Sequence, residues 1–266
     1  MVEKQGKTIL LIIDPQNDFH PGGSLGIEGA NEDSVRIAEL IRTKGDLIDD
    51  IYVTLDSHHR LHLAHGVCWK NAAGESPQPF TLIKNEDIQA GTWVPRDESL
   101  MEYVLYYTQA LEKKGRFVMC IWPEHCLIGT PGHAVVPVLN EALQEWVSKK
   151  MRTVNYVMKG TNCMTEMYSA LCAEVPIPDD PSTKVDPLLI DKLNEATRVL
   201  ICGEAKSHCV NYTMRDLADN WKGELNALVL LDDCCTAVPG FEADGEKFVA
   251  DMKDKGCTIC PVAEAM

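Results

Sequence analysis

The sequence predicts an α/β fold, namely a single three-layer α/β/α domain over residues 1–266 with a central, mostly parallel sheet of about six strands. The alternation of two kinds of segment leads to this prediction. Short apolar runs of strand length alternate with amphipathic segments of helix length along most of the chain. Strands that alternate with helices in this way are typical of a parallel sheet covered by helices on both faces. The periodicity does not reveal the order of the strands within the sheet.

The predicted strands are nearly continuous apolar runs, as expected where both faces of a strand are buried. In chain order they cover residues 8–13, 51–55, 116–121, 153–158, 199–202, 225–231 and 257–262. The predicted helices carry apolar side chains every three or four residues, which gives each of them one face toward the sheet. In chain order they cover residues 31–44, 97–113, 141–149, 164–173, 187–196, a segment that begins near 208, and 241–255.

Residues 66–118 are the least regular part of the chain, and we interpret them as an enlarged insert of the domain. A block of this length between strands of a sheet is usually functional or forms a lid. Just beyond it, Trp122 offers a flat face to an aromatic ligand, unless this side chain packs under its own loop. The glycine-rich stretch 21–26 lacks both the lysine of a P-loop and the GxGxxG spacing, so we expect a turn there and no phosphate site.

Composition excludes several classes of partner. The formal net charge of −15 argues against nucleic acid and anionic membrane surfaces as ligands. No apolar run reaches 18 residues, and the N-terminus leads into the first strand without a secretory apolar region. We therefore expect a cytoplasmic protein with a small-molecule partner, and the sequence leaves open whether it forms a homo-oligomer.

The eleven cysteines point in the same direction. Their number is odd and their spacing irregular, which is typical of reduced thiols in a cytosol rather than of a disulfide framework. Cys257 and Cys260 form a CxxC pair with no second pair nearby, and Cys234 and Cys235 are adjacent. We expect both pairs to be packing residues, with a thiol redox protein as the weaker alternative.

Cys209 is the first candidate for a reactive group. It follows the predicted strand 199–202 and a turn at Gly203, and would lie in the first turn of the helix that begins near His208. The free N–H groups and the dipole of a helix N-terminus stabilise a thiolate, and they can also receive an oxyanion. The alternative is a buried structural cysteine, which is common in protein cores.

Other strand ends carry polar side chains of catalytic types. These are Asp14, Asp56, His58 and Lys159. Because the carboxyl ends of parallel strands share one edge of a sheet, we expect these side chains to meet Cys209 there. A thiol next to an ammonium group and a carboxylate can act as a nucleophile, with the carboxylate as the proton acceptor.

A metal site is predicted at the same edge. Asp56 and His58 are two residues apart, so in an extended segment both point to one face. His125 follows another predicted strand and could complete the site, and one carboxylate with several imidazoles suits a transition metal. His62 and His65 follow in the same loop, and the sequence does not decide whether either joins the site. A polar loop with solvated histidines is the alternative.

Several motifs, taken together and in this order, resemble the isochorismatase-like cysteine hydrolases, with the nicotinamidases as the most similar subgroup. They are Asp14-x-Gln16-Asn17-Asp18-Phe19, Asp56-x-His58, Trp122-Pro123-x-His125-Cys126, Lys159-Gly160-Thr161 with Tyr168-Ser169-Ala170, and Gly203-x-Ala205-x-x-x-Cys209-Val210. The resemblance spans almost the whole chain and is weakest over about 60–118.

The resemblance implies a metal-assisted amidohydrolase that converts nicotinamide and water into nicotinic acid and ammonia through a thioester on Cys209. Asp14, Lys159 and Cys209 match the catalytic triad of the family, and the backbone N–H groups of Ala205 and Cys209 match its oxyanion hole. A cis peptide bond is implied at Glu204-Ala205. Isochorismatase itself cleaves a vinyl ether and generally lacks the cysteine, so Cys209 favours amide hydrolysis.

The resemblance also implies a metal site and a substrate site. The metal ligands would be Asp56, His58 and His125, with His62 matching a further histidine of the family. The ion would be divalent, zinc in the first place, with iron or manganese as alternatives. The substrate would contact Phe19, Trp122 and Tyr168, the first two as aromatic walls on either side of a pyridine ring.

Three departures from the family pattern leave the substrate open. Ser57 stands where tryptophan is usual, Lys206-Ser207-His208 replaces the usual Thr-Asp-aromatic stretch, and the block 66–118 is longer than expected. A hydrolase of another small amide is therefore one alternative, and a non-catalytic binding protein of the same fold is another. The enzyme predicts that Cys209 is alkylated rapidly, and the binding protein predicts slow alkylation.

Overall fold

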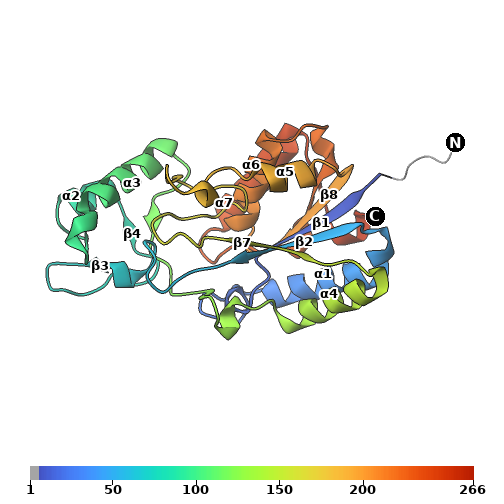
Figure 1. Ribbon diagram of the computed structural model, residues 1–266, viewed down its shortest axis with the longest axis horizontal. Coiled ribbons are helices and arrows are strands. Elements are labelled where there is room, and N and C mark those ends of the chain that lie inside the picture. The colour runs from blue at the N-terminus through green and yellow to red at the C-terminus, as the bar shows by residue number, and fades with distance from the viewer. Residues whose placement is uncertain (1–5) are drawn as a thin grey trace.

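A computed structural model describes residues 6–266; the first five residues of the predicted domain lie outside the described part of the chain. The predicted three-layer α/β/α class is confirmed. Six strands form one sheet, and every neighbouring pair in it is parallel (Figure 1). From edge to edge the strands are β10 (Thr258–Cys260), β9 (Leu228–Leu231), β8 (Arg198–Gly203), β1 (Thr8–Ile13), β2 (Asp50–Asp56) and β7 (Asn155–Lys159).

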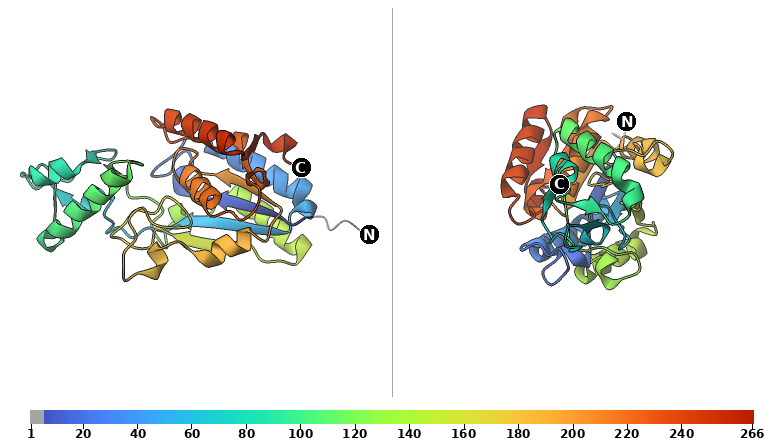
Figure 2. Two further views of the ribbon diagram at one scale, coloured as in Figure 1. Left: turned by 90° about the horizontal axis from the view of Figure 1, so that it is seen from above. Right: turned by 90° about the vertical axis from the view of Figure 1, so that its left-hand side faces the viewer.

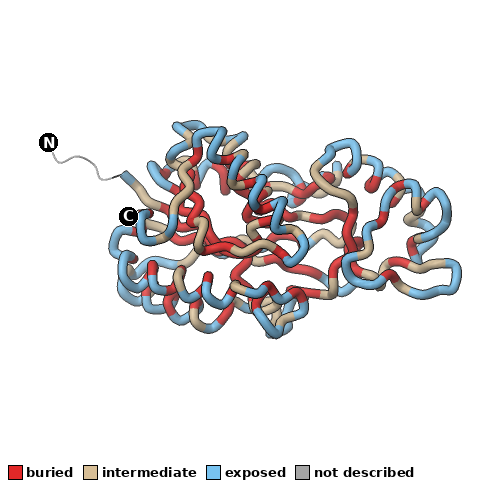
Figure 3. Tube along the Cα trace, turned by 180° about the vertical axis from the view of Figure 1, so that it is seen from behind, coloured by how far each residue is buried: buried red, intermediate tan, exposed pale blue. Residues whose placement is uncertain are grey.

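Helices cover both faces of this sheet (Figures 1 and 2). One face packs against α1 (Ala30–Lys44) and α4 (Pro137–Lys150). The opposite face packs against α5 (Pro187–Leu193), α6 (Cys209–Asp219) and α7 (Glu242–Lys255). The central strand β1 (TILLII) is buried on both sides, which explains its unbroken apolar sequence. In Figure 3 the buried residues accordingly follow the strands, and the exposed ones follow the outer faces of the helices.

The strand register places the predicted reactive residues at one edge. Ile13, just before Asp14, pairs with Gly203 of β8, and Asp56 pairs with Lys159 across β2 and β7. Because β8, β1, β2 and β7 are consecutive in the sheet, their carboxyl ends lie side by side. The topology therefore brings together segments that are far apart in the sequence.

Residues 66–118 project beyond the carboxyl ends of the strands and form a small unit (Figures 1 and 2). It contains α2 (Asn85–Gln89), α3 (Met101–Lys114), β3 (Trp69–Lys70), β4 (Leu82–Ile83) and β5 (Val94–Pro95). β3 pairs with β5, and β4 pairs with β6 (Met119–Cys120), both antiparallel. This unit has its own apolar cluster, in which Trp69, Val104, Tyr107 and Leu111 are almost completely buried.

Two predicted elements were wrong. The strand predicted over 116–121 is reduced to Met119–Cys120, which pairs with Leu82–Ile83 and lies outside the main sheet. The helix predicted over 164–173 does not form, although its apolar residues have helical spacing. The N–H groups that would have built the helix donate to distant side chains instead: that of Glu166 to the Tyr107 hydroxyl and that of Ala170 to Thr213 Oγ1.

The other predicted elements are confirmed with shifted ends. The largest shifts are at the starts of two helices: the helix predicted from 141 begins at Pro137, and the helix predicted from 97 begins at Met101, after a 3₁₀ turn over Glu98–Leu100. In the strand predicted over 225–231, Leu225–Ala227 form a 3₁₀ turn. No helix within residues 6–266 is both long and apolar enough to cross a membrane.

Candidate active site

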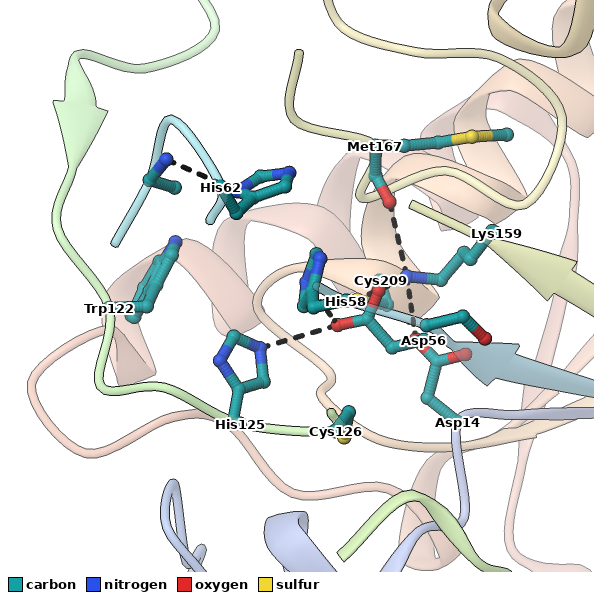
Figure 4. Close-up of polar contacts among 12 residues, drawn as sticks. Asp14, Asp56, His58, His62, Trp122, His125, Cys126, Lys159, Met167 and Cys209 are labelled. Atoms are coloured by element: carbon teal, nitrogen blue, oxygen red, sulfur yellow. Dashed lines mark hydrogen bonds and ion pairs between the residues drawn. The ribbon is translucent and has the colours of Figure 1, made fainter. Parts of the chain in front are cut away.

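Three predicted catalytic side chains meet at the carboxyl edge of the sheet (Figure 4). The Lys159 ammonium lies 2.9 Å from Asp14 Oδ2 and 3.5 Å from Cys209 Sγ. It also donates to Asp56 Oδ1 and to the Met167 carbonyl, each at 3.1 Å. All of these polar side chains are buried, so Lys159 is enclosed by hydrogen-bond acceptors and counter-charges.

Burial and charge decide the protonation of these groups. Burial would lower the pKa of Lys159, but the carboxylates of Asp14 and Asp56 outweigh it and raise the pKa well above its usual value. Burial raises the pKa of Asp14, with Lys159 opposing. Burial also raises the pKa of the Cys209 thiol well above its usual value, again opposed by Lys159. Burial therefore favours the thiol form of Cys209, whereas the Lys159 ammonium favours the thiolate.

The backbone of each segment explains how these side chains are held. Asp14 has a φ of 43°, in the left-handed region that aspartate tolerates better than most residues, and its N–H donates to Thr54 Oγ1 at 3.0 Å. Gly160, with a φ of 73°, follows Lys159, and a Cβ there would lie 2.9 Å from Asp56 Oδ1. Only glycine lets this chain segment pass so close to Asp56. Cys209 is the first residue of α6, as predicted.

The predicted metal ligands form a compact cluster beside the triad (Figure 4). Donor atoms of Asp56, His58 and His125 lie within 4.8 Å of one another, and all three residues are buried. Asp56 Oδ2 lies 3.0 Å from His58 Nε2 and 3.3 Å from His125 Nε2. Burial would raise the pKa of Asp56, but the charges of His58 and Lys159 hold it well below its usual value.

These residues fit a divalent metal ion. His125 Nδ1 lies 2.8 Å from the Pro123 carbonyl, which accepts from Nδ1–H and leaves the Nε2 lone pair directed at the cluster. A backbone carbonyl at the far ring nitrogen is the usual outer-shell partner of a metal-bound histidine. His58 Nδ1 is buried without a partner within the described residues. One carboxylate oxygen and imidazole nitrogens are donors that zinc and similar ions prefer.

A cavity with aromatic walls connects the two clusters. It is lined by Phe19, Trp122, Tyr168, Asp56, His125, Ala205 and Cys209, together with Leu25, Glu166, His208 and Val238. The three aromatic residues predicted to contact substrate therefore share this cavity with the nucleophile candidate and two metal ligands. The Trp122 indole N–H donates to the Tyr168 hydroxyl at 2.9 Å, which fixes both rings. The free volume is only about 20 Å³, room for about one water.

Two backbone N–H groups are free beside the thiol. Within residues 6–266, neither the N–H of Ala205 nor that of Cys209 donates a hydrogen bond, whereas His208 and Val210 both donate to the Ala205 carbonyl. The implied cis peptide bond is present at Glu204-Ala205. The arrangement matches what an oxyanion hole needs, namely donors that are not otherwise engaged.

Three features of the site were not predicted correctly or at all. Glu166 is buried and lines the cavity, but its segment was predicted as a helix, so its direction could not be read. His208 lines the cavity too, within ring contact of Trp122, Tyr168 and Phe241. Two signals in the sequence pointed to His208, namely its position before Cys209 and its place in the stretch Lys206-Ser207-His208 that departs from the family pattern. Ser57 departs from the family pattern but does not line the cavity, because its hydroxyl contacts Leu55 and His133.

Comparisons with known proteins agree with the resemblance. No protein-family model matches the chain. The chain is 26% identical over 225 residues to the nicotinamidase of Acinetobacter baylyi, with 85% of this chain and 79% of that protein covered.

Solved structures show the same fold. A nicotinamidase/pyrazinamidase of Acinetobacter baumanii has a TM-score of 0.67 at 21% identity, with 98% of both chains covered. The yeast nicotinamidase bound to the inhibitor nicotinaldehyde has a TM-score of 0.66 at 21% identity, covering 96% of this chain and 99% of its own. The pyrazinamidase of Pyrococcus horikoshii in complex with zinc has a TM-score of 0.58 at 22% identity, covering 96% and 99%. The predicted resemblance to nicotinamidases is thus confirmed at the level of the fold.

Proposed function

We propose that this chain, which shares the fold of the nicotinamidases, is a cysteine amidohydrolase that releases ammonia from nicotinamide through a thioester on Cys209. The observation that carries the proposal is the contact of Lys159 with both Asp14 and Cys209 at the end of an aromatic cavity. A structural cysteine in a core would have no reason to face a buried ammonium group and a buried carboxylate.

In the proposed reaction, Asp14 accepts the thiol proton as Cys209 Sγ attacks the carboxamide carbon. The N–H groups of Ala205 and Cys209 receive the oxyanion. The C–N bond breaks, and Asp14 returns the proton to the departing ammonia. Asp14 then takes a proton from water, and the resulting hydroxide attacks the thioester carbon. The C–S bond breaks, the carboxylic acid leaves, and Asp14 returns the proton to the Cys209 thiolate. Lys159 remains charged throughout and holds Asp14 and the transient thiolate in contact.

Asp56, His58 and His125 are proposed to hold the metal ion, with zinc as the first choice because the ligands combine one carboxylate and imidazoles. When bound, the ion would supply a Lewis acid that orients a ligand by its ring nitrogen. Phe19 and Trp122 would enclose the ring, with Tyr168 fixing the indole. Because the free volume is about 20 Å³, the walls must separate to admit a six-membered ring.

We also keep the sequence-based proposals for the extent of the domain, its partners and its location in the cell. Residues 66–118 are proposed as an insert of one domain, since β4 of this unit pairs with β6, which leads directly to Trp122 at the cavity. The partner is proposed to be a small amide, with a homo-oligomer left open. A cytoplasmic location is proposed because the odd number and irregular spacing of the cysteines are typical of reduced thiols.

The test is ammonia release from nicotinamide by the zinc-loaded protein and its Cys209→Ala variant. We expect the variant to retain ligand binding but to lose turnover by a factor of about 10⁴ or more, as removal of a nucleophile does elsewhere. Cys202→Ala is the matched control, because this thiol is also buried but faces the other side of the sheet. Full activity of Cys209→Ala would end the proposal.

Two other outcomes separate the alternatives. If nicotinamide is inert but another small carboxamide is hydrolysed only when Cys209 is present, the chain is an amidohydrolase of a different substrate. His208 is then the first residue to examine, because it lines the cavity and departs from the family pattern. If no amide reacts and Cys209 is alkylated no faster than the other cysteines, the chain is a binding protein of this fold.

A further inference from the structure

Two buried histidines next to the metal cluster have no assigned role. His62 and His65 lie in the loop after β2, and their exposed fractions are 1% and 0%. The Nε2 atom of each is buried and has no hydrogen-bond partner within the described residues. A buried polar atom without a partner costs free energy, so each of these atoms calls for an explanation.

The hydrogen bond of its other nitrogen fixes the tautomer of His65. His65 Nδ1 lies 3.0 Å from the Arg60 carbonyl oxygen, which can only accept, so Nδ1 carries the proton. Nε2 of the neutral ring is then a lone pair. His125 has the same arrangement, with Nδ1 at the Pro123 carbonyl and Nε2 toward Asp56. A ring held by a carbonyl at one nitrogen is prepared to bind a metal with the other.

His62 has the opposite arrangement. The backbone N–H of Ala64 donates to His62 Nδ1 at 3.2 Å, so this nitrogen provides the lone pair. Nε2 of the neutral ring then carries the proton and cannot bind a metal without giving up the contact with Ala64. Both histidines follow Asp56 in the same loop, but their hydrogen bonds give them different roles. His65 presents a lone pair on Nε2 and is a potential metal ligand, whereas His62 presents an Nε2–H group and is a potential hydrogen-bond donor.

The spacing of the rings suits a shared ion. Imidazoles that bind one tetrahedral ion with a metal–nitrogen distance of about 2.0–2.1 Å have ring centres about 5 Å apart. The ring centre of His65 lies 5.5 Å from that of His58 and 5.8 Å from that of His125, and the latter two are 4.9 Å apart. Among the residues that the structure describes, Asp56, His58 and His125 are the group with donor atoms within 4.8 Å of one another, so the His65 ring must move inward when it binds.

We propose that His65 binds the metal ion through Nε2 as a third imidazole, in addition to Asp56, His58 and His125. The inference depends on the proposed metal site and extends it. The resulting set of one oxygen and three nitrogens favours a borderline ion such as Zn²⁺ over Mg²⁺. A ligand nitrogen or water can still occupy a fifth position, because zinc sites expand to five ligands.

Metal affinity, measured without any substrate, tests the inference. In His65→Asn, the side-chain amide N–H can still donate a hydrogen bond to the Arg60 carbonyl, but the Nε2 atom that is proposed to bind the metal is lost. We expect zinc affinity, measured by competition with a chromogenic chelator, to fall at least tenfold, the loss caused even by removing an outer-shell partner of a metal site. His62→Asn is the matched control, because its amide oxygen can accept from Ala64, and we expect a change of less than threefold. The exposed His59→Ala should not change affinity.

A second measurement guards against a variant that loses zinc through misfolding. The cobalt-substituted wild type should show the intense visible absorption of a four- or five-coordinate ion, and His65→Asn should show a weaker, shifted spectrum while its far-UV circular dichroism stays unchanged. Equal affinity and spectra for wild type and His65→Asn would overturn the inference, as would a loss confined to His62→Asn or a wild type that binds no zinc. If zinc binding depends on His65 but no amide is hydrolysed, the inference stands and the proposed function fails.

Discussion

A lysine in the core of a protein needs a counter-charge, and Lys159 has two. Its contacts with Asp14 and Asp56 are both about 3 Å long and shielded from water. Removing one partner of such a buried pair leaves an uncompensated charge, which costs roughly 3–5 kcal/mol. The residue types at this site could be predicted from the sequence because each of them lies at the carboxyl end of a strand or shortly after it. Their contacts could not, because they depend on the register of strands that are distant in sequence.

Glu174 provides a pH prediction at the same scale. Its side chain is buried near the C-terminal end of α3, where Oε2 lies 3.4 Å from the ammonium of Lys114. Burial raises the pKa of Glu174 to about 7. The folded state therefore keeps a proton that the unfolded chain releases above its ordinary pKa of about 4.5. The contribution of Glu174 to the free energy of unfolding is therefore fully present below pH 4.5. It falls by about 1.4 kcal/mol per pH unit up to pH 7, which is about 3 kcal/mol in total.

A glutamine in place of Glu174 has no acidic proton to release. We expect Glu174→Gln to remove that part of the pH dependence, so that its free energy of unfolding by urea changes less than that of the wild type between pH 5 and pH 7.5. Glu102→Gln, at an exposed position of α3, is the control. Parallel pH profiles for wild type and Glu174→Gln would contradict the raised pKa.

At the scale of elements, the helix predicted over 164–173, which does not form, shows that the spacing of apolar residues alone does not determine secondary structure. Helical spacing of apolar residues predicts a helix only if the backbone bonds to itself. Here tyrosines of α3 intervene: the Tyr103 hydroxyl donates to the Met164 carbonyl at 2.6 Å, and the Tyr107 hydroxyl accepts from the Glu166 N–H at 3.0 Å. Such partners come from a distant part of the chain. Glu166 was missed as a cavity residue for the same reason.

These contacts predict that α3 holds the loop that carries Glu166. Tyr107→Phe removes the acceptor of the Glu166 N–H and leaves that group buried, so we expect a loss of about 1–3 kcal/mol in the free energy of unfolding. Faster hydrogen exchange should be confined to the loop around Glu166. Tyr106→Phe is the matched control, since this neighbouring ring is 55% exposed. Equal effects of the two substitutions would mean that the loop does not depend on α3.

For the whole molecule, the topology explains why the fold was easier to predict than the pocket. Apolar runs such as Thr8–Ile13 are buried on both faces, and this alone requires a sheet between two layers of helices. The pocket is assembled from loops, whose conformations depend on one another. His208 and Glu166 enter the cavity from two different loops, and no local pattern reports that.

The cluster of buried imidazoles next to Asp56 also affects the stability of the entire domain. Without an ion, several buried nitrogens of His58, His62 and His65 have no partner within the described residues. An ion that binds only the folded chain stabilises it by about 2.7 kcal/mol at 100 times the dissociation constant. Because 1 kcal/mol shifts the melting temperature of a chain of this size by about 2–4 °C, we expect an increase of about 5–10 °C.

The melting temperature should therefore fall when a chelator removes the ion and recover with Zn²⁺, but not with Mg²⁺, because imidazole ligands favour zinc. His125→Ala should abolish the response to zinc, whereas His59→Ala, at an exposed position, should retain it. Equal melting temperatures with chelator and with excess zinc would show that these histidines are core residues and hold no ion. The metal-dependent parts of the proposed function would then have to be abandoned, while the arrangement of Asp14, Lys159 and Cys209 would still have to be explained.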